Sequence, residues 1–201
     1  MQKCIALIRR EQITNAALAI VVEQGIEAAT MRRLACEVGV SPACLYYYYK
    51  DKVELLKAVF EENYKLFMNI TRKAVNSSKT TLDTLKYIYN ETVKAEKVFR
   101  VLRLIIFSDA LCRSEPRLKK IINEYQLSIQ EVLMNLILQG QSRDEVRSDI
   151  QAKELFVFYV VGIVASSFFD VGRLESPEMT SNSQVGWKLF YSAIQLPQYY
   201  K

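Results

Sequence analysis

The stretch VGVSPACLYYYYK, residues Val38–Lys50, decides the fold of this chain. Its four consecutive tyrosines, Tyr46–Tyr49, fit neither a strand, which would alternate apolar and polar residues, nor an ordinary amphipathic helix, which would interrupt them. The Ser41 side chain can accept a hydrogen bond from a free N–H group at a helix start, and Pro42 suits the first helical position because it has no N–H to lose. We therefore expect a short helix that begins at Ser41–Pro42 and ends near Lys50.

Two further helices are predicted before this one. An apolar stripe with helical spacing ends at Gly25, a residue suited to the left-handed backbone that follows a helix. The stripe consists of Ile13, Ala16, Ala17, Ile20 and Val21. Thr30 can cap a second helix of about two turns, which Gly39 ends. A glycine-containing turn therefore joins this second helix to the tyrosine-rich one.

Two short helices joined by such a turn form a helix-turn-helix motif, whose second helix lies in the major groove of DNA. Helical spacing places Leu45 and Tyr49 one turn apart, facing the preceding helix. Four residues then point outward, Pro42, Ala43, Tyr46 and Tyr47. Together with the cap residue Ser41, they are candidate DNA contacts. Small side chains let the backbone approach DNA, and phenol groups can reach phosphates or base edges. Tyr48 lies between the two faces, and the pattern assigns it to neither.

Basic residues lie on both sides of the outward face. Arg32 and Arg33 are in the first turn of the preceding helix, and Lys50 and Lys52 are beside the start of the next helix. Such positions favour contact with a DNA strand through its phosphates. Each of these charges has the alternative of lying on an ordinary solvated surface, and the tyrosine cluster has the alternative of packing or of binding a protein.

The composition of the 201 residues favours an all-α globular protein. Hydrophobic residues make up 50% and charged residues 24%, and 6 glycines and 4 prolines leave few helix breakers. The formal net charge of +5 is compatible with a polyanionic partner but does not by itself identify one.

We predict an N-terminal three-helix DNA-binding domain, residues 1–52, and a C-terminal helical domain, residues 53–201.

The second predicted domain contains long helices. Asp51 with Glu54 resembles a capping box that opens a helix through Phe67. Further helical patterns cover residues 82–93, 98–111, 116–140, 153–169 and 185–196. The apolar run Leu155–Phe169 is shorter than the roughly 20 residues that span a bilayer, which favours a buried or subunit-interface helix over a membrane span.

Several function classes are disfavoured. The four cysteines show no CxxC spacing, and the chain has no histidine, so neither a metal site nor a Cys-His nucleophile is expected. No acidic pair lies within an apolar pattern, so we do not expect an enzyme, and we expect no cofactor. The first residues hold too short an apolar stretch for a signal peptide, which predicts a cytoplasmic protein with free thiols.

The segment from Ile13 to Val59 resembles the DNA-binding region of TetR-family transcriptional regulators. The resemblance covers the Gly25 turn, Thr30, the GVS of Gly39–Ser41, the Leu45–Tyr46 pair, and Lys52 with the two leucines that follow. A weaker similarity is the segment QGQSRDEVRSDI, residues 139–150, before the penultimate helix. Pro-Ala-Cys follows Ser41 where many members have Lys-Gly-Thr, so the operator sequence is not inherited.

The resemblance implies that Thr30, Tyr46, Tyr47 and Lys52 contact phosphates, and that the exposed positions of the tyrosine-rich helix contact bases. It also implies a homodimer formed by the last two helices, and hence a palindromic operator in double-stranded DNA. The expected interface residues are Phe158, Val161, Val164, Ala165, Phe168, Trp187, Phe190, Tyr191 and Ile194.

The resemblance further implies a pocket for a small-molecule effector, whose binding releases the DNA. It also implies that the protein is a repressor. The expected lining is apolar or aromatic with one arginine, which suits a hydrophobic or aromatic effector. It comprises Phe60, Tyr64, Phe67, Phe99, Arg103, Phe107, Phe156 and Tyr159. Simple core packing is the alternative for these residues. The alternative for the whole chain is an all-α protein-interaction module with a tyrosine-rich docking face and no specific DNA site.

Overall fold

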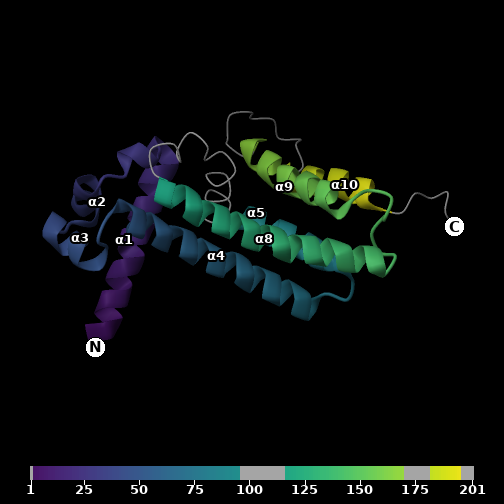
Figure 1. Cartoon of the computed structure of the whole chain (residues 1–201), viewed down its shortest axis with the longest axis horizontal. Coiled ribbons are helices and arrows are strands. Elements are labelled where there is room, and N and C mark those ends of the chain that lie inside the picture. Colours follow the sequence, from purple (N-terminus) through teal and green to yellow (C-terminus); the bar gives the residue numbers. More distant parts are fainter. Residues whose placement is uncertain (1, 96–115, 170–181, 196–201) are drawn as a thin grey trace. The chain divides into compact units, whose positions relative to one another are not determined.

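The computed structural model describes residues 2–95, 116–169 and 182–195, apart from the side chains of residues 2–9, 22, 26, 167–169 and 182–185. Every regular element in these ranges is a helix, which confirms the predicted all-α class (Figure 1). The helix predicted at residues 98–111 lies outside the described residues. None of the described helices is long and apolar enough to cross a membrane.

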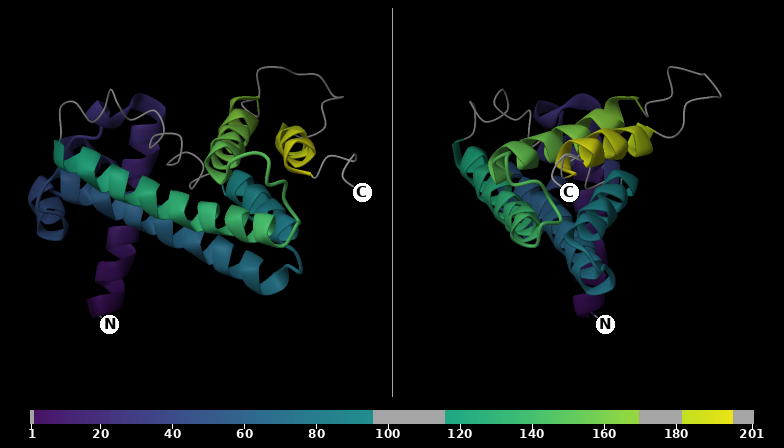
Figure 2. Two further views of the ribbon diagram at one scale, coloured as in Figure 1. Left: turned by 45° about the vertical axis from the view of Figure 1, so that its right-hand side comes forward. Right: turned by 90° about the vertical axis from the view of Figure 1, so that its right-hand side faces the viewer.

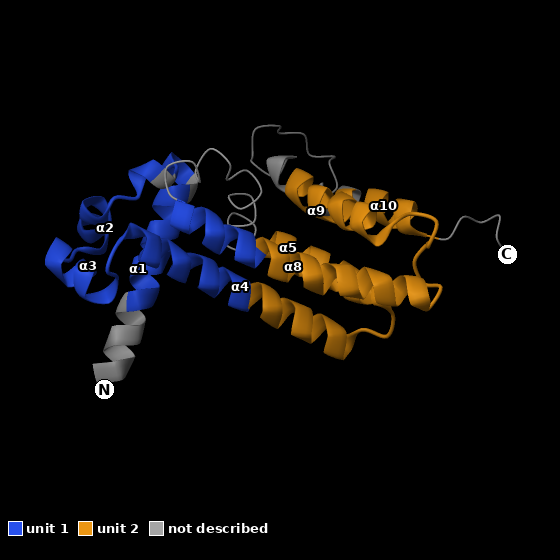
Figure 3. Cartoon of the chain, viewed as in Figure 1, with its two compact units in different colours: residues 1–65, 103–125 blue, residues 66–102, 126–201 orange. Residues whose placement is uncertain are grey.

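The chain forms two compact units (Figure 3). The first contains residues 1–65 and 103–125, and the second contains residues 66–102 and 126–201. Two long helices, α4 (Lys52–Ser77) and α8 (Pro116–Ser142), each contribute their beginning to the first unit and their remainder to the second. The predicted domain boundary between residues 52 and 53 stays a prediction.

Three helices and a 3-10 turn precede α4 in the first unit. They are α1 (Gln2–Gln24), η1 (Ile26–Ala28), α2 (Met31–Val38) and α3 (Pro42–Tyr48). Gly25 and Gly39 both have positive φ, +85° and +70°, as expected of residues that end helices. The hydroxyl of Thr30 accepts a hydrogen bond from the Arg33 N–H at 3.3 Å, and that of Ser41 accepts one from the Cys44 N–H at 3.2 Å. The caps predicted for both short helices are therefore confirmed.

The side chains behind α3 form part of the core of this unit. Leu45 is fully buried and Tyr49 is only 3% exposed, which confirms the predicted inward pair. Leu34 of α2 and Leu55 of α4 are also fully buried. Burial of such side chains contributes about 1.5–3 kcal/mol each to the free energy of folding. These residues therefore stabilise a helix that is too short to be stable alone.

The start of α4 differs in one detail from the predicted capping box. Asp51 Oδ1 accepts a hydrogen bond from the Glu54 N–H at 2.9 Å, as expected. The carboxylate of Glu54, however, accepts from the Lys50 N–H at 2.7 Å. In a standard capping box, the N–H of the capping residue itself would be the donor. Two acidic side chains therefore bind backbone N–H groups here, Glu54 that of Lys50 in the loop before α4 and Asp51 that of Glu54 in the first turn of α4.

The second unit contains α5 (Thr81–Lys94), α9 (Ala152–Phe169) and α10 (Asn182–Ile194), with the remaining parts of α4 and α8. α9 and α10 lie side by side (Figure 2). The predicted starts and ends of these helices differ from the observed ones by at most three residues, because sequence patterns locate a helix better than its ends.

The loop between α8 and α9 joins two helix ends of this unit. A carboxylate oxygen of Glu145 accepts a hydrogen bond from the Thr81 N–H at the start of α5. The Arg147 N–H donates to the Ile194 carbonyl at 3.0 Å, and the Arg147 guanidinium donates to the Ala193 carbonyl at 3.3 Å. An acid at a helix start and a base at a helix end both complement the helix dipole. This loop therefore stabilises the start of α5 and the end of α10.

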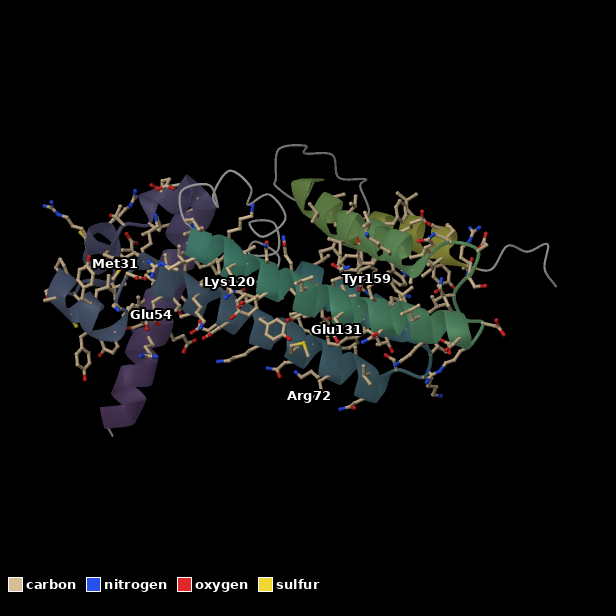
Figure 4. The ribbon with its side chains drawn as sticks, viewed as in Figure 1. Met31, Glu54, Arg72, Lys120, Glu131 and Tyr159 are labelled. Carbon is tan, nitrogen blue, oxygen red and sulfur yellow. The ribbon has the colours of Figure 1, made fainter. Side chains whose placement is uncertain are left out.

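Two tyrosines connect α5 with α9 inside the second unit. The hydroxyl of Tyr89 donates to the Gly162 carbonyl at 2.8 Å, and the hydroxyl of Tyr159 on α9 (Figure 4) donates to the Leu85 carbonyl at 2.8 Å. Each helix therefore supplies one donor to the backbone of the other. The Tyr89 hydroxyl also lies 2.6 Å from Ser166 Oγ. Burial raises the pKa of both phenols above its usual value of 10.0, so they remain neutral donors.

Gly186 of α10 lies against this hydrogen-bond cluster. A Cβ atom at this position would meet the Tyr89 hydroxyl and would come within 2.6 Å of Ser166 Oγ. At Gly162 of α9 the nearest atom, on the Tyr89 ring, would be 3.6 Å away, which is an ordinary contact. Only glycine at position 186 allows α10 to lie this close to α5 and α9.

Thr92, one turn beyond Tyr89 on α5, has a fully buried side chain. Its hydroxyl has no hydrogen-bond partner among the described residues. An unsatisfied buried hydroxyl costs about 1–3 kcal/mol of stability. The sequence pattern predicted no role for this residue.

We predict that Gly186→Ala lowers the free energy of unfolding by about 1–3 kcal/mol, because the added methyl group overpacks a site that cannot expand freely. Gly162→Ala is the matched control, since it adds the same methyl group to a helical glycine without a clash; it should leave stability unchanged or raise it. Thermal and chemical denaturation of both variants checks this. Equal melting temperatures for the two variants would contradict it.

We also predict that Thr92→Val raises the free energy of unfolding by about 1 kcal/mol, because it replaces an unsatisfied hydroxyl by a methyl group of the same shape. Thr92→Ala, which also removes a methyl group and leaves a small cavity, should gain less. The measurement is denaturant unfolding of the three proteins. A destabilised Thr92→Val protein would show that the hydroxyl has a partner.

Candidate nucleic-acid interface

The outward face of α3 carries the residues that the sequence predicts to contact DNA. Pro42 and Ala43 are exposed, and Tyr46 and Tyr47 are 53% and 84% exposed. Adjacent exposed aromatic side chains are a common feature of interaction sites. The two phenols can donate and accept hydrogen bonds, and the small residues one turn earlier leave the helix backbone accessible.

Tyr48, which the sequence pattern left unassigned, is half-buried beside this face. Its ring meets the Tyr47 ring edge to face, at a centroid distance of 5.3 Å and an angle of 88°. Its carbonyl accepts a hydrogen bond from the Arg10 guanidinium of α1 at 3.5 Å. Tyr48 therefore holds the Tyr47 ring and joins the end of α3 to α1.

Arg10 is a residue of this region that the sequence analysis missed. Its guanidinium carbon lies 5.5 Å from the centre of the Tyr49 ring, a cation–π distance. Burial raises the pKa of Tyr49 to about 12, although the charge of Arg10 opposes the shift. Tyr49 is therefore neutral at physiological pH and serves the core, as predicted.

The predicted basic residues surround the outward face of α3. Arg32 and Arg33 are exposed in the first turn of α2, and Lys50 is exposed after α3. Lys52 is half-buried, and its ammonium group lies 3.7 Å from the Glu27 carboxylate. An exposed ion pair of this kind contributes only about 0–1 kcal/mol, so a DNA phosphate could replace Glu27 at little cost.

Thr30 and Ser41 use their side-chain oxygens as helix caps, as described above. A hydroxyl oxygen that accepts one hydrogen bond can still donate its own proton. The capping role is therefore compatible with the predicted phosphate contact of Thr30, which is exposed. The DNA contacts of Thr30 and Ser41 stay predictions.

Asp51 is a second feature that the sequence analysis did not assign to this region. It lies between Lys50 and Lys52, and its Oδ2 atom is 3.0 Å from the guanidinium of Arg117 in the first turn of α8. The hydrogen bond from the Glu54 N–H, and next the Arg117 guanidinium, hold the pKa of Asp51 below its usual value of 3.8. Asp51 is therefore ionised at physiological pH, among residues that are predicted to bind phosphate.

The nine residues that were predicted at the dimer interface have two kinds of environment. Phe158, Val161 and Tyr191 are exposed, and Ala165 is half-buried. Four others are buried within the protomer: Val164, Trp187, Phe190 and Ile194. The side chain of Phe168 lies outside the described ones. Val157 and Leu189, which the sequence analysis did not name, are also exposed.

We refer to the five exposed residues as the apolar surface of α9 and α10: Val157, Phe158, Val161, Leu189 and Tyr191. Buried residues of the predicted dimer interface pack beneath this surface. Phe158, for example, stacks on buried Phe190 at a centroid distance of 6.3 Å, and Trp187 contacts Tyr191 at 6.0 Å. Their contacts are with their own protomer.

The predicted effector-pocket residues are distributed over both units. Phe60 is buried and Tyr64 half-buried in the first unit, where both rings contact the ring of Tyr125 on α8, at 6.3 and 5.4 Å. In the second unit Phe67 and Tyr159 are buried and Phe156 is half-buried. Phe99, Arg103 and Phe107 lie outside the described residues. The pocket therefore stays a prediction.

Comparison with known proteins agrees with these features. Residues 13–59 match the family of bacterial regulatory proteins described as the tetR family. The nucleoid occlusion factor SlmA of Pasteurella multocida is 30% identical over 110 residues, which cover 54% of this chain and 47% of that protein. This chain thus spans about half the length of that relative.

Two further comparisons cover more of the chain. The HTH-type transcriptional regulator TtgR of Pseudomonas putida is 22% identical over 166 residues, 77% of this chain and 78% of that protein. The crystal structure of the transcriptional regulator FadR from Bacillus subtilis in complex with stearoyl-CoA has a TM-score of 0.69 at 18% identity, and covers 92% of this chain and 99% of that chain. The latter similarity shows a common fold.

The matched segment contains both caps of the helix-turn-helix, its buried Leu45 and Tyr49, and its exposed tyrosines. The fold of the remaining helices is also that of solved regulators. Residues 13–59 therefore carry the DNA-binding segment of the tetR family of bacterial regulatory proteins, and the chain resembles the transcriptional regulators of that family.

Proposed function

We propose that this protein is a repressor that binds a palindromic operator in double-stranded DNA as a homodimer, and that a small hydrophobic or aromatic effector releases it. The observation that carries the proposal is the division of α3 into two faces. Leu45 and Tyr49 are buried, whereas Tyr46 and Tyr47 are exposed beside Pro42 and Ala43. A helix that packs on the core through one face can enter a major groove with the other face, without rearrangement of the core.

The charges around α3 support contact with the DNA backbone. Arg32, Arg33 and Lys50 are exposed near its two ends, and Lys52 has an exposed acidic partner that a phosphate can replace. Contacts of this kind position a protein on the duplex but do not specify a sequence. Binding should therefore weaken steeply as the salt concentration rises.

The apolar surface of α9 and α10 supports the homodimer. Its residues are exposed on two neighbouring helices, and an apolar surface of this kind on a soluble protein favours burial against another subunit. A two-fold axis brings the same surface of both subunits together and relates the two copies of α3. Two symmetric copies would bind half-sites of opposite orientation, so the operator should be palindromic.

The effector is proposed from the aromatic residues and from the relatives. Phe60 and Tyr64 form an aromatic cluster with Tyr125, and the fold is shared with a regulator whose structure contains stearoyl-CoA. An effector releases DNA only if it binds the DNA-incompetent conformation more tightly. Acyl-CoA thioesters and planar aromatic compounds are therefore the first compounds to test for release of the operator.

Selection from a random duplex DNA pool at moderate salt tests the proposed function. Enrichment of a palindrome would support sequence-specific binding by a dimer and would supply the operator for effector screening. Enrichment of a single half-site would contradict the two-fold arrangement. No enrichment, together with no salt-dependent affinity, would favour a protein-docking role for the exposed tyrosines.

We predict that Tyr47→Ala weakens operator binding by at least about tenfold, because a hydrogen bond to a charged group contributes about 1.5–3 kcal/mol. Its melting temperature should not change, since the side chain is 84% exposed. Fluorescence anisotropy and thermal denaturation measure the two quantities. Tyr49→Ala is the matched control, and it should lower the melting temperature because that ring is buried. Unchanged affinity of Tyr47→Ala would remove this residue from the interface.

We predict that Val161→Asp dissociates the dimer while each protomer remains folded, because Val161 is 55% exposed within the protomer and a buried unpaired charge is costly at an interface. Val75→Asp is the control, since Val75 is 53% exposed on α4, outside the predicted interface. Sedimentation velocity measures the state of both variants. If both sediment as the parent protein does, the interface lies elsewhere.

A further inference from the structure

The loop between α3 and α4 places an acid where the proposed DNA contact needs positive charge. Asp51 stands between Lys50 and Lys52, directly after the helix that is proposed to enter the major groove. An unpaired carboxylate at this position would repel the phosphate backbone. The arrangement of groups around Asp51 is therefore relevant to DNA affinity.

Both oxygens of Asp51 are occupied, by two different helices. Oδ1 accepts the Glu54 N–H of α4 at 2.9 Å, and Oδ2 lies 3.0 Å from Nη1 of Arg117 on α8. These partners are three and 66 residues away in the sequence. Asp51 thus joins the first turn of α4, where Glu54 lies (Figure 4), to the first turn of α8.

Arg117 is presented by a well-packed part of α8. Leu118, the next residue, and Ile122, one turn after Leu118, are buried, and Tyr125 contacts the rings of Phe60 and Tyr64 on α4. These contacts lie within the first unit and fix the first turns of α8 against α4. The backbone that carries the guanidinium is therefore held in place, although the guanidinium itself is largely exposed.

We propose that Arg117 is a positioning residue for DNA binding, which neutralises Asp51 and holds the start of α4, and with it Lys50 and the end of α3, against α8. This inference rests on the proposed DNA-binding function and adds a means of control. Because α8 extends from Arg117 into the second unit as one helix, a displacement of its first turn would break the ion pair and uncover the acid. The pair contributes little to stability because it is exposed, so its effect should be confined to DNA affinity and to the local structure.

A double-mutant cycle with Arg117→Gln and Asp51→Asn tests the proposal. The asparagine retains a side-chain oxygen that can accept the Glu54 N–H, so the helix cap is preserved. Affinity is measured by anisotropy with a labelled random-sequence duplex at low salt. We expect Arg117→Gln to weaken binding by about tenfold, which is within the range of coupling between contacting charged groups. We expect it to have no effect once Asp51 is replaced by Asn.

Lys120→Gln is the matched control, because Lys120 is an exposed residue one turn further along α8 (Figure 4) and the substitution removes the same charge. Its effect should be much smaller than that of Arg117→Gln. Equal effects of the two substitutions would overturn the proposal in favour of general attraction to DNA. Persistence of the Arg117→Gln effect in the Asp51→Asn background would overturn it in favour of a direct contact between Arg117 and phosphate.

A second measurement does not depend on DNA. Amide hydrogen exchange in the free protein should be faster at Glu54 in Arg117→Gln than in the parent protein, because Asp51 loses its second partner. Unchanged exchange would overturn the positioning role. If the parent protein shows no salt-dependent DNA binding, the proposed function fails, whereas the exchange experiment still decides whether Arg117 holds the start of α4.

Discussion

The packing of α3 through its buried side chains Leu45 and Tyr49 is the interaction on which the proposed DNA interface depends. A helix of seven residues has no stability of its own, because it makes too few internal hydrogen bonds to offset its ordering. Burial of two side chains one turn apart supplies that stability from one face, while the Ser41 cap and Pro42 define where the helix starts. The opposite face can then expose two tyrosines without any loss of packing.

Charged side chains around this helix form two ion pairs and a hydrogen bond to the backbone. Glu27 lies near Lys52, Glu54 binds the Lys50 N–H, and Arg117 binds Asp51. None of these pairs is deeply buried, so each contributes little to folding and can be exchanged. Their consequence is local: the backbone of Lys50, the ammonium group of Lys52 and the acid between them are held in one arrangement. This arrangement is consistent with the proposed control of DNA affinity.

Packing in the second unit depends on close approach between helices. Gly186 admits the Tyr89 hydroxyl, and Tyr89 and Tyr159 each donate to a carbonyl of the opposite helix. Since α5, α9 and α10 are joined in this way, the exposed apolar surface on α9 and α10 is carried by a rigid support. The loop that caps α5 with Glu145 and α10 with Arg147 fixes the same three-helix arrangement from one end.

By itself, the sequence determined the features that depend on neighbours along the chain. The caps at Thr30 and Ser41, the glycine at position 39, and the inward pair Leu45 and Tyr49 follow from spacing within one or two helical turns.

Only the tertiary structure decided which apolar residues of α9 and α10 are covered. α9 is apolar on almost every side, so periodicity could not show that Val161 is exposed and Tyr159 buried. The pairing of Asp51 with Arg117 likewise joins residues 66 positions apart, and no local pattern encodes such a contact because it exists only once α8 packs on α4.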